Sequence, residues 1–373
     1  MSIALSQVPI TVAVARSKLP KASVGNRRVA RWLYSVAAMI FVMVTLGGAT
    51  RLTGSGLSIM EWAPFRGALP PLSDAEWQRL FAMYRAIPQY NLLNQGFGLE
   101  GFQQIFWLEY LHRLWGRLIG LAFALPLLWF WATGQIERRL RLAMFGLLLL
   151  GAAQGGVGWL MVASGFDHDA ISVSPYRLVV HLCLALTLYA AIVWTALSVS
   201  AARYSSRPTS SEIGPAGKYL RHWVVGLCLA LGLTIVAGGF VAGTHAGLDY
   251  NTFPLMDGQF VPDGYATLRP AWRNLTENVA SVQFNHRLLA TITALLSLVV
   301  CGLGLRDASV PRLPLLALTG LIGLQYVLGV ITLLWGVPTG LGTAHQANAV
   351  AVLTAALVLL HTLRLPQRRP ERS

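Results

Sequence analysis

The chain has 373 residues, of which 55% are hydrophobic and 12% are charged, and its mean hydropathy is +0.56. This composition is too apolar for an ordinary soluble domain of this length, and it predicts a membrane protein. The formal net charge of +14 does not indicate nucleic-acid binding, because the basic residues gather at the ends of apolar runs rather than in a basic domain with interleaved aromatic residues.

Eight apolar runs follow one another along the chain, and each is long enough to cross a bilayer core of about 30 Å. They cover residues 32–50, 105–131, 142–163, 178–199, 222–243, 284–305, 313–335 and 342–363. We therefore predict an all-α integral membrane protein whose eight transmembrane helices form two pseudo-symmetric four-helix bundles. The three cysteines lie inside these runs, and we predict neither a disulfide framework nor a cysteine metal site.

The segments between the runs suggest a division into five parts. We predict a basic tail (1–30), an amino-terminal half (31–200), a linker rich in Ser, Pro and Gly (201–220), a carboxy-terminal half (221–365) and a second tail (366–373). Most of the 29 Lys and Arg residues fall in the tails and the even-numbered connections, which places both termini in the cytoplasm. The basic first tail lacks the amphipathic pattern of a mitochondrial transit peptide, so a bacterial cytoplasmic tail is the preferred interpretation.

The first outer connection is long and contains a helix signal of its own. Ser73 is a suitable N-cap for a short amphipathic helix that carries Trp77, Leu80, Phe81 and Tyr84. We expect this helix to lie on the membrane surface or to cover the bundle.

The two halves repeat the same sequence features in the same order. Glu-Tyr-Leu-His-Arg-Leu at 109–114 matches Gln-Phe-Asn-His-Arg-Leu at 283–288, an offset of 174 residues. The other matched features are Gly47-Gly48 with Gly238-Gly239 at an offset of 191, Gln154 and Gly158 with Gln325 and Gly329 at 171, and His181 with His345 at 164. We interpret the glycines as positions where helices pack closely.

Four histidines of the repeat, His112, His181, His286 and His345, should lie near the outer ends of their helices, one pair in each half. Histidines inside membrane helices are functional candidates, and two imidazoles from different helices can bind the iron of one haem. The alternative is that each forms only an interhelical hydrogen bond. The duplicated register favours two haems.

Arginines close to the first histidine of each pair are candidates for binding haem propionates. Arg113 and Arg287 directly follow His112 and His286, and Arg117 is a further candidate. The other interpretation is that these side chains extend to the lipid headgroups.

The repeat differs at one polar position. Glu109 lies three residues before His112, on the same face of the helix, whereas the second half has Gln283 there. A carboxylate can move protons or stabilise a developing cation, but an amide can only form hydrogen bonds. We therefore predict chemistry in the first half and a fixed cofactor in the second, unless Glu109 merely caps the membrane end of its helix. His245 has no duplicate, and its role is left open.

Several strings resemble haem A synthase, the CtaA/Cox15 family. The resemblance covers about residues 31–363 and is carried by Gly-Gly-Ala-Thr-Arg-Leu-Thr-Gly-Ser-Gly-Leu-Ser (47–58), Glu-Trp-Ala-Pro-Phe-Arg-Gly-Ala-Leu-Pro-Pro-Leu (61–72), Glu-Tyr-Leu-His-Arg-Leu-Trp-Gly-Arg-Leu-Ile-Gly (109–120) and Thr-Ala-His-Gln (343–346). The strings look most like the proteobacterial and mitochondrial branch. Some members have a cysteine pair in an outer loop, and this chain has none there.

The resemblance implies an oxidoreductase that oxidises the C8 methyl of haem O to the formyl group of haem A, for cytochrome oxidase. It implies that Glu109 is the essential acid, that His112 and His181 bind the substrate haem, and that His286 and His345 bind a haem b cofactor. Haem O, membrane lipid, haem O synthase and oxidase assembly factors are the expected partners, and a homo-oligomer is left open. The expected location is the bacterial inner membrane with the haems toward the periplasm, or else the mitochondrial inner membrane. The electron donor and the route of oxygen activation stay undetermined.

Two other classes of protein were compared with this prediction. A diheme b-type cytochrome that passes electrons from quinol would share the helices and histidines, but it would not need the difference between Glu109 and Gln283. A transporter with duplicated halves should have broken helices and charges at the midplane, and the sequence shows neither.

Overall fold

The structure, a computed structural model, describes residues 22–63, 66–167, 170–201 and 215–364. Within these residues it is helical, and eight helices are long and apolar enough to cross a membrane, which confirms the predicted fold class. They are α1 (Ala22–Leu52), α4 (Leu99–Ala132), α5 (Arg138–Ala163), α6 (Pro175–Ala201), α7 (Pro215–Gly243), α8 (Val279–Leu305), α9 (Arg312–Leu334) and α10 (Thr339–Thr362). Two shorter helices, α2 (Asp74–Tyr84) and α3 (Pro88–Leu93), lie in the first outer connection.

The helices extend beyond the predicted apolar runs. Pro215, inside the predicted linker 201–220, starts α7 at a position where proline is favoured, and α1 begins within the predicted tail 1–30. The remainder of both segments and the whole of the tail 366–373 lie outside the described residues.

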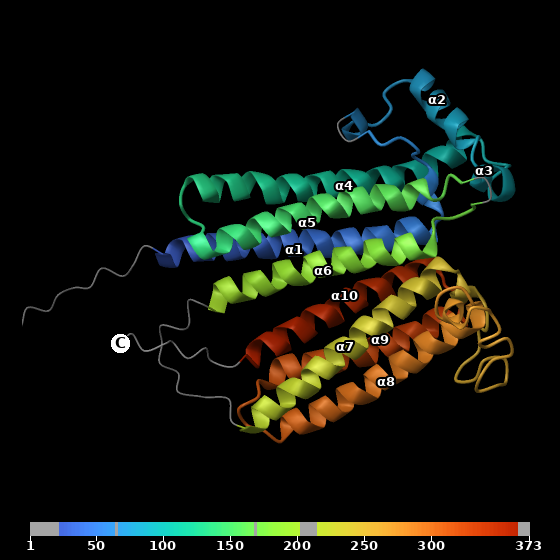
Figure 1. Cartoon of the computed structure of the whole chain (residues 1–373). Helices are drawn as coiled ribbons and strands as arrows, with labels where there is room; N and C mark the ends of the chain where they lie inside the picture. Colours follow the sequence, from blue (N-terminus) through green and yellow to red (C-terminus); the bar gives the residue numbers. More distant parts are fainter. Residues whose placement is uncertain (1–21, 64–65, 168–169, 202–214, 365–373) are drawn as a thin grey trace, which may run out of the picture.

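The long helices form two neighbouring groups of four (Figure 1). One contains α1, α4, α5 and α6, and the other contains α7, α8, α9 and α10. Between the groups, α1 contacts α10 and α7 contacts α6, the exchange expected of a pseudo-twofold relation. The short helices and the loop 244–278 lie at one end of the molecule, and the start of α1 and the end of α10, the described termini, lie at the other.

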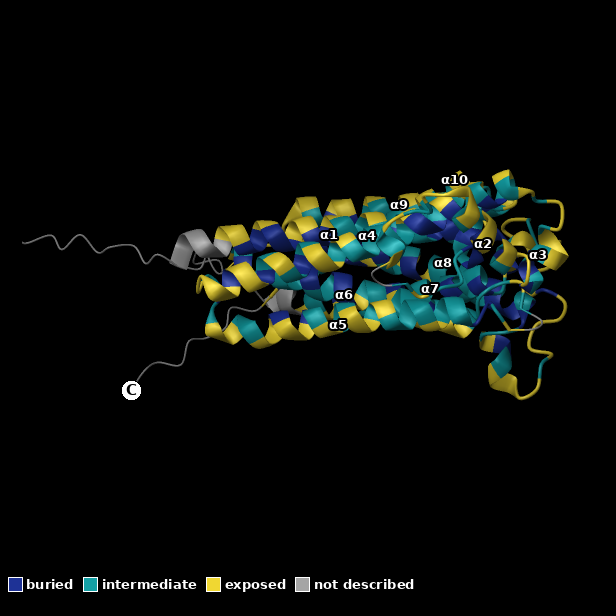
Figure 2. Ribbon diagram, turned by 90° about the horizontal axis from the view of Figure 1, so that it is seen from above, coloured by how far each residue is buried: buried dark blue, intermediate teal, exposed yellow. Residues whose placement is uncertain are grey.

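Each group of helices has a core of buried apolar residues, and many other large apolar residues of the same helices are exposed. Figure 2 shows buried and exposed positions along the helices in dark blue and yellow. The core of the first half is centred on α1 and α6 and includes Val350 of α10. A separate core in the second half joins all four of its helices. The last helix therefore belongs to both cores.

The second glycine of each Gly-Gly pair lies at the interface between the halves. A Cβ at Gly48 of α1 would collide with the side chain of Gln346 on α10, whose amide donates to the Val44 carbonyl at 2.7 Å. At the equivalent position of the second half, Gly239 of α7 lies against Leu182 of α6, the residue that corresponds to Gln346 in the repeat. Both glycines permit close packing, as the sequence predicts.

The predicted helix in the first outer connection is confirmed as α2. The Ser73 hydroxyl accepts from the Glu76 amide at 3.3 Å, as an N-cap does. Tyr84 and Phe81 pack on Phe102, which is 0% exposed and lies in the first turn of α4. α4 begins at Leu99 rather than at 105 because α2, and not the bilayer, covers this added turn.

Candidate functional site

The first histidine of each half lies against the first glycine of the Gly-Gly pair. A Cβ placed at Gly47 of α1 would lie 2.9 Å from Cε1 of His112 on α4, and a Cβ at Gly238 of α7 would lie 2.9 Å from Cε1 of His286 on α8. Such a contact is too close for any residue with a side chain. These two glycines thus accommodate imidazole rings, a more specific role than the helix packing inferred from the sequence.

The second histidine of each half lies on a glycine as well. A Cβ at Gly158 of α5 would lie 2.7 Å from Cε1 of His181, and a Cβ at Gly329 of α9 would lie 3.0 Å from Cε1 of His345. The paired glutamines, one helical turn before these glycines, form hydrogen bonds to the same rings. Gln154 Nε2 is 3.1 Å from His181 Nδ1, and Gln325 Nε2 is 3.2 Å from His345 Nε2. In each half, the repeated Gly therefore makes room for the ring of the second histidine, and the repeated Gln forms a hydrogen bond to it.

The structure brings the four histidines together in the predicted pairs. His112 lies close enough to His181, and His286 close enough to His345, for their charges to interact. All four side chains are half-buried inside their bundles. Across the described part of the chain, no three His, Cys, Asp or Glu side chains gather as metal ligands, so the histidines form pairs, the number of axial positions at a haem iron.

These surroundings fit a bound haem. In each pair one imidazole nitrogen, Nδ1 of His112 and Nδ1 of His345, is buried without a hydrogen-bond partner among the described residues. Buried polar atoms without partners are rare in proteins and indicate a ligand or a strained site. Because the histidines gather in pairs and no larger group of metal-ligating side chains occurs among the described residues, they would suit a haem iron better than a tetrahedral metal centre.

The hydrogen bonds around the two pairs differ at His286 and at Gln325. His286 Nδ1 donates to the Thr234 carbonyl at 3.1 Å, which would leave Nε2 available to a ligand, and Asn348 donates to Gln325 Oε1 at 2.8 Å. In the first half, Nδ1 of His112 and Oε1 of Gln154 have no such partner among the described residues. The position equivalent to Asn348 is Leu184, which cannot donate a hydrogen bond from its side chain.

Glu109 is 3% exposed, and both of its carboxylate oxygens accept hydrogen bonds. Oε2 accepts from the Ser58 hydroxyl at 2.7 Å and from the Ile59 amide at 2.8 Å. Oε1 accepts from Arg113 Nε at 2.9 Å and Nη2 at 2.5 Å. Arg113 in turn donates to the main-chain carbonyls of Ile59 and, at 2.9 Å, Glu61. The pair thus fastens the outer loop to α4.

The second half contains the same fastening with an amide in place of the carboxylate. Gln283 Oε1 accepts from Arg287 at 2.9 Å, and Gln283 Nε2 donates to the Ala246 and Asp249 carbonyls at 2.6 and 2.5 Å. Arg287 also donates to the carbonyls of Tyr250 and Thr252, at 2.6 and 2.9 Å. These two residues follow Ile59 and Glu61 by 191 positions, the offset of the Gly-Gly pairs.

The three arginines predicted to bind propionates therefore contact outer-loop carbonyls. Arg113 and Arg287 bind the two carbonyls described above, and Arg117 donates to the Ala63 carbonyl at 2.9 Å. Neither the loop carbonyls nor Thr234 could be recognised from sequence, because a main-chain contact leaves no residue pattern. Asn348 could have been noticed as a polar residue one turn after His345 in an apolar run.

The other histidines lie apart from the pairs or outside the described residues. His245 has a left-handed backbone, with φ of 59°, at the position where the first half has Gly54 with φ of 68°. Partial burial lowers the pKa of His245, and the nearby charge of Arg51 lowers it further. His361 is buried beside Trp194 at the end that holds the termini, and His168 lies outside the described residues.

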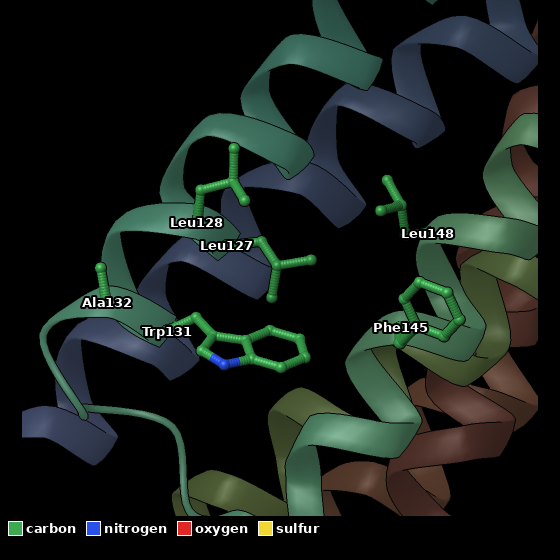
Figure 3. A pocket seen from close by; sticks show the side chains of 6 residues that line it. All are labelled: Leu127, Leu128, Trp131, Ala132, Phe145 and Leu148. Atoms are coloured by element: carbon green, nitrogen blue, oxygen red, sulfur yellow. The ribbon is translucent and has the colours of Figure 1, made fainter.

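Two of the cavities in the described part of the chain lie away from the histidine pairs. One, of about 420 Å³, lies at the outer loop of the second half and is lined by Asp249, Tyr250, Asp257 and Val279. The other, of about 440 Å³, separates α4 from α5 toward the end with the termini, and Figure 3 shows its apolar lining of Leu127, Leu128, Trp131, Ala132, Phe145 and Leu148. Its almost entirely apolar surface suits a lipid chain.

Comparison with known proteins gives consistent matches over most of the chain. The COX15-CtaA family, described as cytochrome oxidase assembly protein, matches residues 30–357. A heme A synthase of Granulibacter bethesdensis is 54% identical over 336 residues, which cover 90% of this chain and 87% of the relative. A heme A synthase of Azorhizobium caulinodans is 49% identical, covering 92% and 97%, and heme A synthase 2 of Acidiphilium cryptum is 44% identical, covering 94% of each. None of these names supports the diheme electron-transfer cytochrome.

Proposed function

Because the chain belongs to the COX15-CtaA family of cytochrome oxidase assembly proteins, we infer that it is a haem A synthase. It is a multi-pass membrane oxidoreductase that converts haem O to haem A by oxidising the C8 methyl to a formyl group, for use in cytochrome oxidase. The observation that carries this inference is the agreement of relatives that are 44–54% identical over nine tenths of the chain or more.

We propose that the first half (31–200) binds the substrate haem through His112 and His181, and that the second half (221–365) holds haem b through His286 and His345. The unequal hydrogen bonding supports this assignment. A permanent cofactor benefits from ligands held in one orientation, and Thr234 orients His286 while Asn348 orients Gln325, which contacts His345. A substrate has to enter and leave, and the less constrained first pair suits that exchange.

Bound haem supplies the iron-centred redox chemistry, and we propose that Glu109 supplies a fixed negative charge one helical turn from His112. Donors hold both of its oxygens, so the carboxylate is oriented in advance and its charge requires no reorganisation during the reaction. In that position it can stabilise positive charge that develops as the methyl group is oxidised. Gln283 lacks this charge, so we propose no chemistry in the second half. Arg113, Arg117 and Arg287 are then positioning residues for the outer loops.

We propose that the protein lies in the bacterial inner membrane with both termini in the cytoplasm and the histidine pairs toward the periplasm. The described basic residues Arg138, Arg139 and Arg141 lie at the end that holds the termini, as the distribution of positive charge predicts. We also propose that haem O synthase and oxidase assembly factors exchange haem with it, since haem O and haem A both partition into lipid.

The test is to express the chain in a bacterial strain that makes haem O but lacks its own haem A synthase, and to identify the extracted haems by mass. We expect formyl-bearing haem A, and haem O alone would contradict the proposed function. His112→Ala should abolish haem A but retain the b-type absorption spectrum, whereas His286→Ala should remove that spectrum. Loss of the b-type spectrum in folded His112→Ala would show that the two halves have the opposite roles.

A further inference from the structure

Arg51 has a buried guanidinium nitrogen without a partner in the described part of the chain. It lies in the last turn of α1, four residues after Gly47, so the two share a helix face. Nη2 of Arg51 is buried and has no hydrogen-bond partner among the described residues, and no salt bridge there includes this arginine. A cation removed from water needs a compensating anion, so this arrangement points to an anionic ligand.

The surroundings of Arg51 contain a second basic group. His245, the αL residue that follows α7, lies close enough for its charge to interact with that of Arg51. The buried carboxylate of Glu109, on α4, is bound by Arg113, Ser58 and Ile59, and no salt bridge among the described residues joins it to Arg51. Arg51, on the face of α1 that accommodates His112, and His245 of the second half therefore lie near one another.

The repeat makes this site specific to the first half. The residue 191 positions after Arg51 is Ala242, which has no charge. The partly unsatisfied arginines Arg141 and Arg221 lie at the opposite end of the helices, and Arg287 binds loop carbonyls. Among the described residues, an arginine with a buried, unpartnered nitrogen and no hydrogen bond to a loop carbonyl is thus found toward the outer end of the bundle only at Arg51.

We propose that Arg51 binds a carboxylate of the substrate, a propionate group of haem O, with His245 beside it; this rests on the proposed function. One helical turn, about 5.4 Å, separates Arg51 from the glycine that accommodates His112, so a porphyrin held by that histidine can reach the guanidinium with its acidic edge. Arginine binds carboxylates through two parallel charge-assisted hydrogen bonds. The same cation could attract a lipid phosphate, but its position on the His112 face of α1 favours the haem carboxylate.

The experiment compares haem O with its dimethyl ester, in which both propionates are uncharged. The full-length protein is purified in detergent with haem b retained, and each ligand is titrated by its absorption spectrum. We expect Arg51→Gln to weaken haem O binding by about 30-fold or more, the loss associated with removing one partner of a buried charge pair, and to leave binding of the ester unchanged. Arg51→Lys should recover part of the affinity. Arg85→Gln, which changes an exposed arginine after α2, is the control and should alter neither affinity.

Equal affinities of wild type and Arg51→Gln for haem O would overturn the proposal, as would an equal loss for haem O and the ester. An unchanged affinity together with less phospholipid copurifying with Arg51→Gln would assign the site to lipid and refute the haem carboxylate. If Arg51→Gln does not fold, the Arg51→Lys comparison decides in the same way. Conversion of haem O by the wild-type protein tests the proposed function separately, because ligand binding is measured without turnover.

Discussion

Glu109→Gln perturbs the fastening of the first outer loop in a way that the structure allows to be quantified. Donors surround both oxygens of the carboxylate, and the amide nitrogen of glutamine cannot accept a hydrogen bond. In either orientation of the amide, its NH₂ group therefore faces donors. The less costly orientation keeps oxygen toward Arg113 and places NH₂ toward Ser58 and Ile59. The Ser58 hydroxyl can rotate to accept from it, but the Ile59 amide loses its partner.

The cost follows from these contacts. An unsatisfied buried amide costs about 1–3 kcal/mol, and replacing the charged acceptor of Arg113 by a neutral one costs about 1 kcal/mol more. We therefore expect the opening free energy of the loop to fall by about 3 kcal/mol. Each 1.4 kcal/mol is a factor of ten, so the Ile59 amide should exchange with deuterium about 100-fold faster.

Hydrogen exchange read by mass spectrometry on peptides that contain residues 58–61 measures this change, and haem A output is measured on the same variants. Ser58→Ala is the matched control, because it removes one hydrogen bond and keeps the carboxylate. Unchanged exchange in Glu109→Gln would refute the reasoning about the loop. If loop exchange rises equally in both variants but only Glu109→Gln abolishes haem A, the charge itself is required. Equal losses of haem A would reduce Glu109 to a positioning residue.

Three further predictions follow from contacts in the second half. Gly238→Ala should displace His286, since the new methyl would lie 2.9 Å from the ring, and should abolish the b-type absorption spectrum. Gly232→Ala on the same helix is the control and should preserve that spectrum, because a Cβ there has nothing within 4 Å. Gln283→Glu should lower the thermal unfolding temperature of the detergent-purified protein, because a carboxylate would face the Ala246 and Asp249 carbonyls at a cost of about 1–3 kcal/mol, and an unchanged temperature would contradict this contact. Asn348→Leu should release Gln325 and speed the transfer of haem b to an apoprotein acceptor, whereas an unaltered rate would show that the amide does not retain the cofactor.

The fold was predictable because bilayer thickness sets a length that eight apolar runs satisfy, and because Ser73 is a recognisable cap. The early start of α4 was not predictable, since Phe102 is buried by α2, a contact that no local pattern records. In the site, the repeat identified the four histidines and the difference between Glu109 and Gln283. It could not identify Arg51, because a lone basic residue at a helix end resembles a lipid anchor until its lack of partners is visible in three dimensions.

The contact of Gly48 with Gln346 has a consequence for the order of biosynthesis. The hydrogen bond from Gln346 to the Val44 carbonyl joins the first transmembrane helix to the last, across 302 positions of the sequence. Because α1 is synthesised long before α10, the face of α1 that packs on α10 must be covered by lipid or by a chaperone until α10 is inserted. Chains that stop before Thr339 lack the partner of Gly48 and also the Val350 side chain that completes the first core. Premature termination near the end of the message should therefore lead the cell to degrade the first half along with the second.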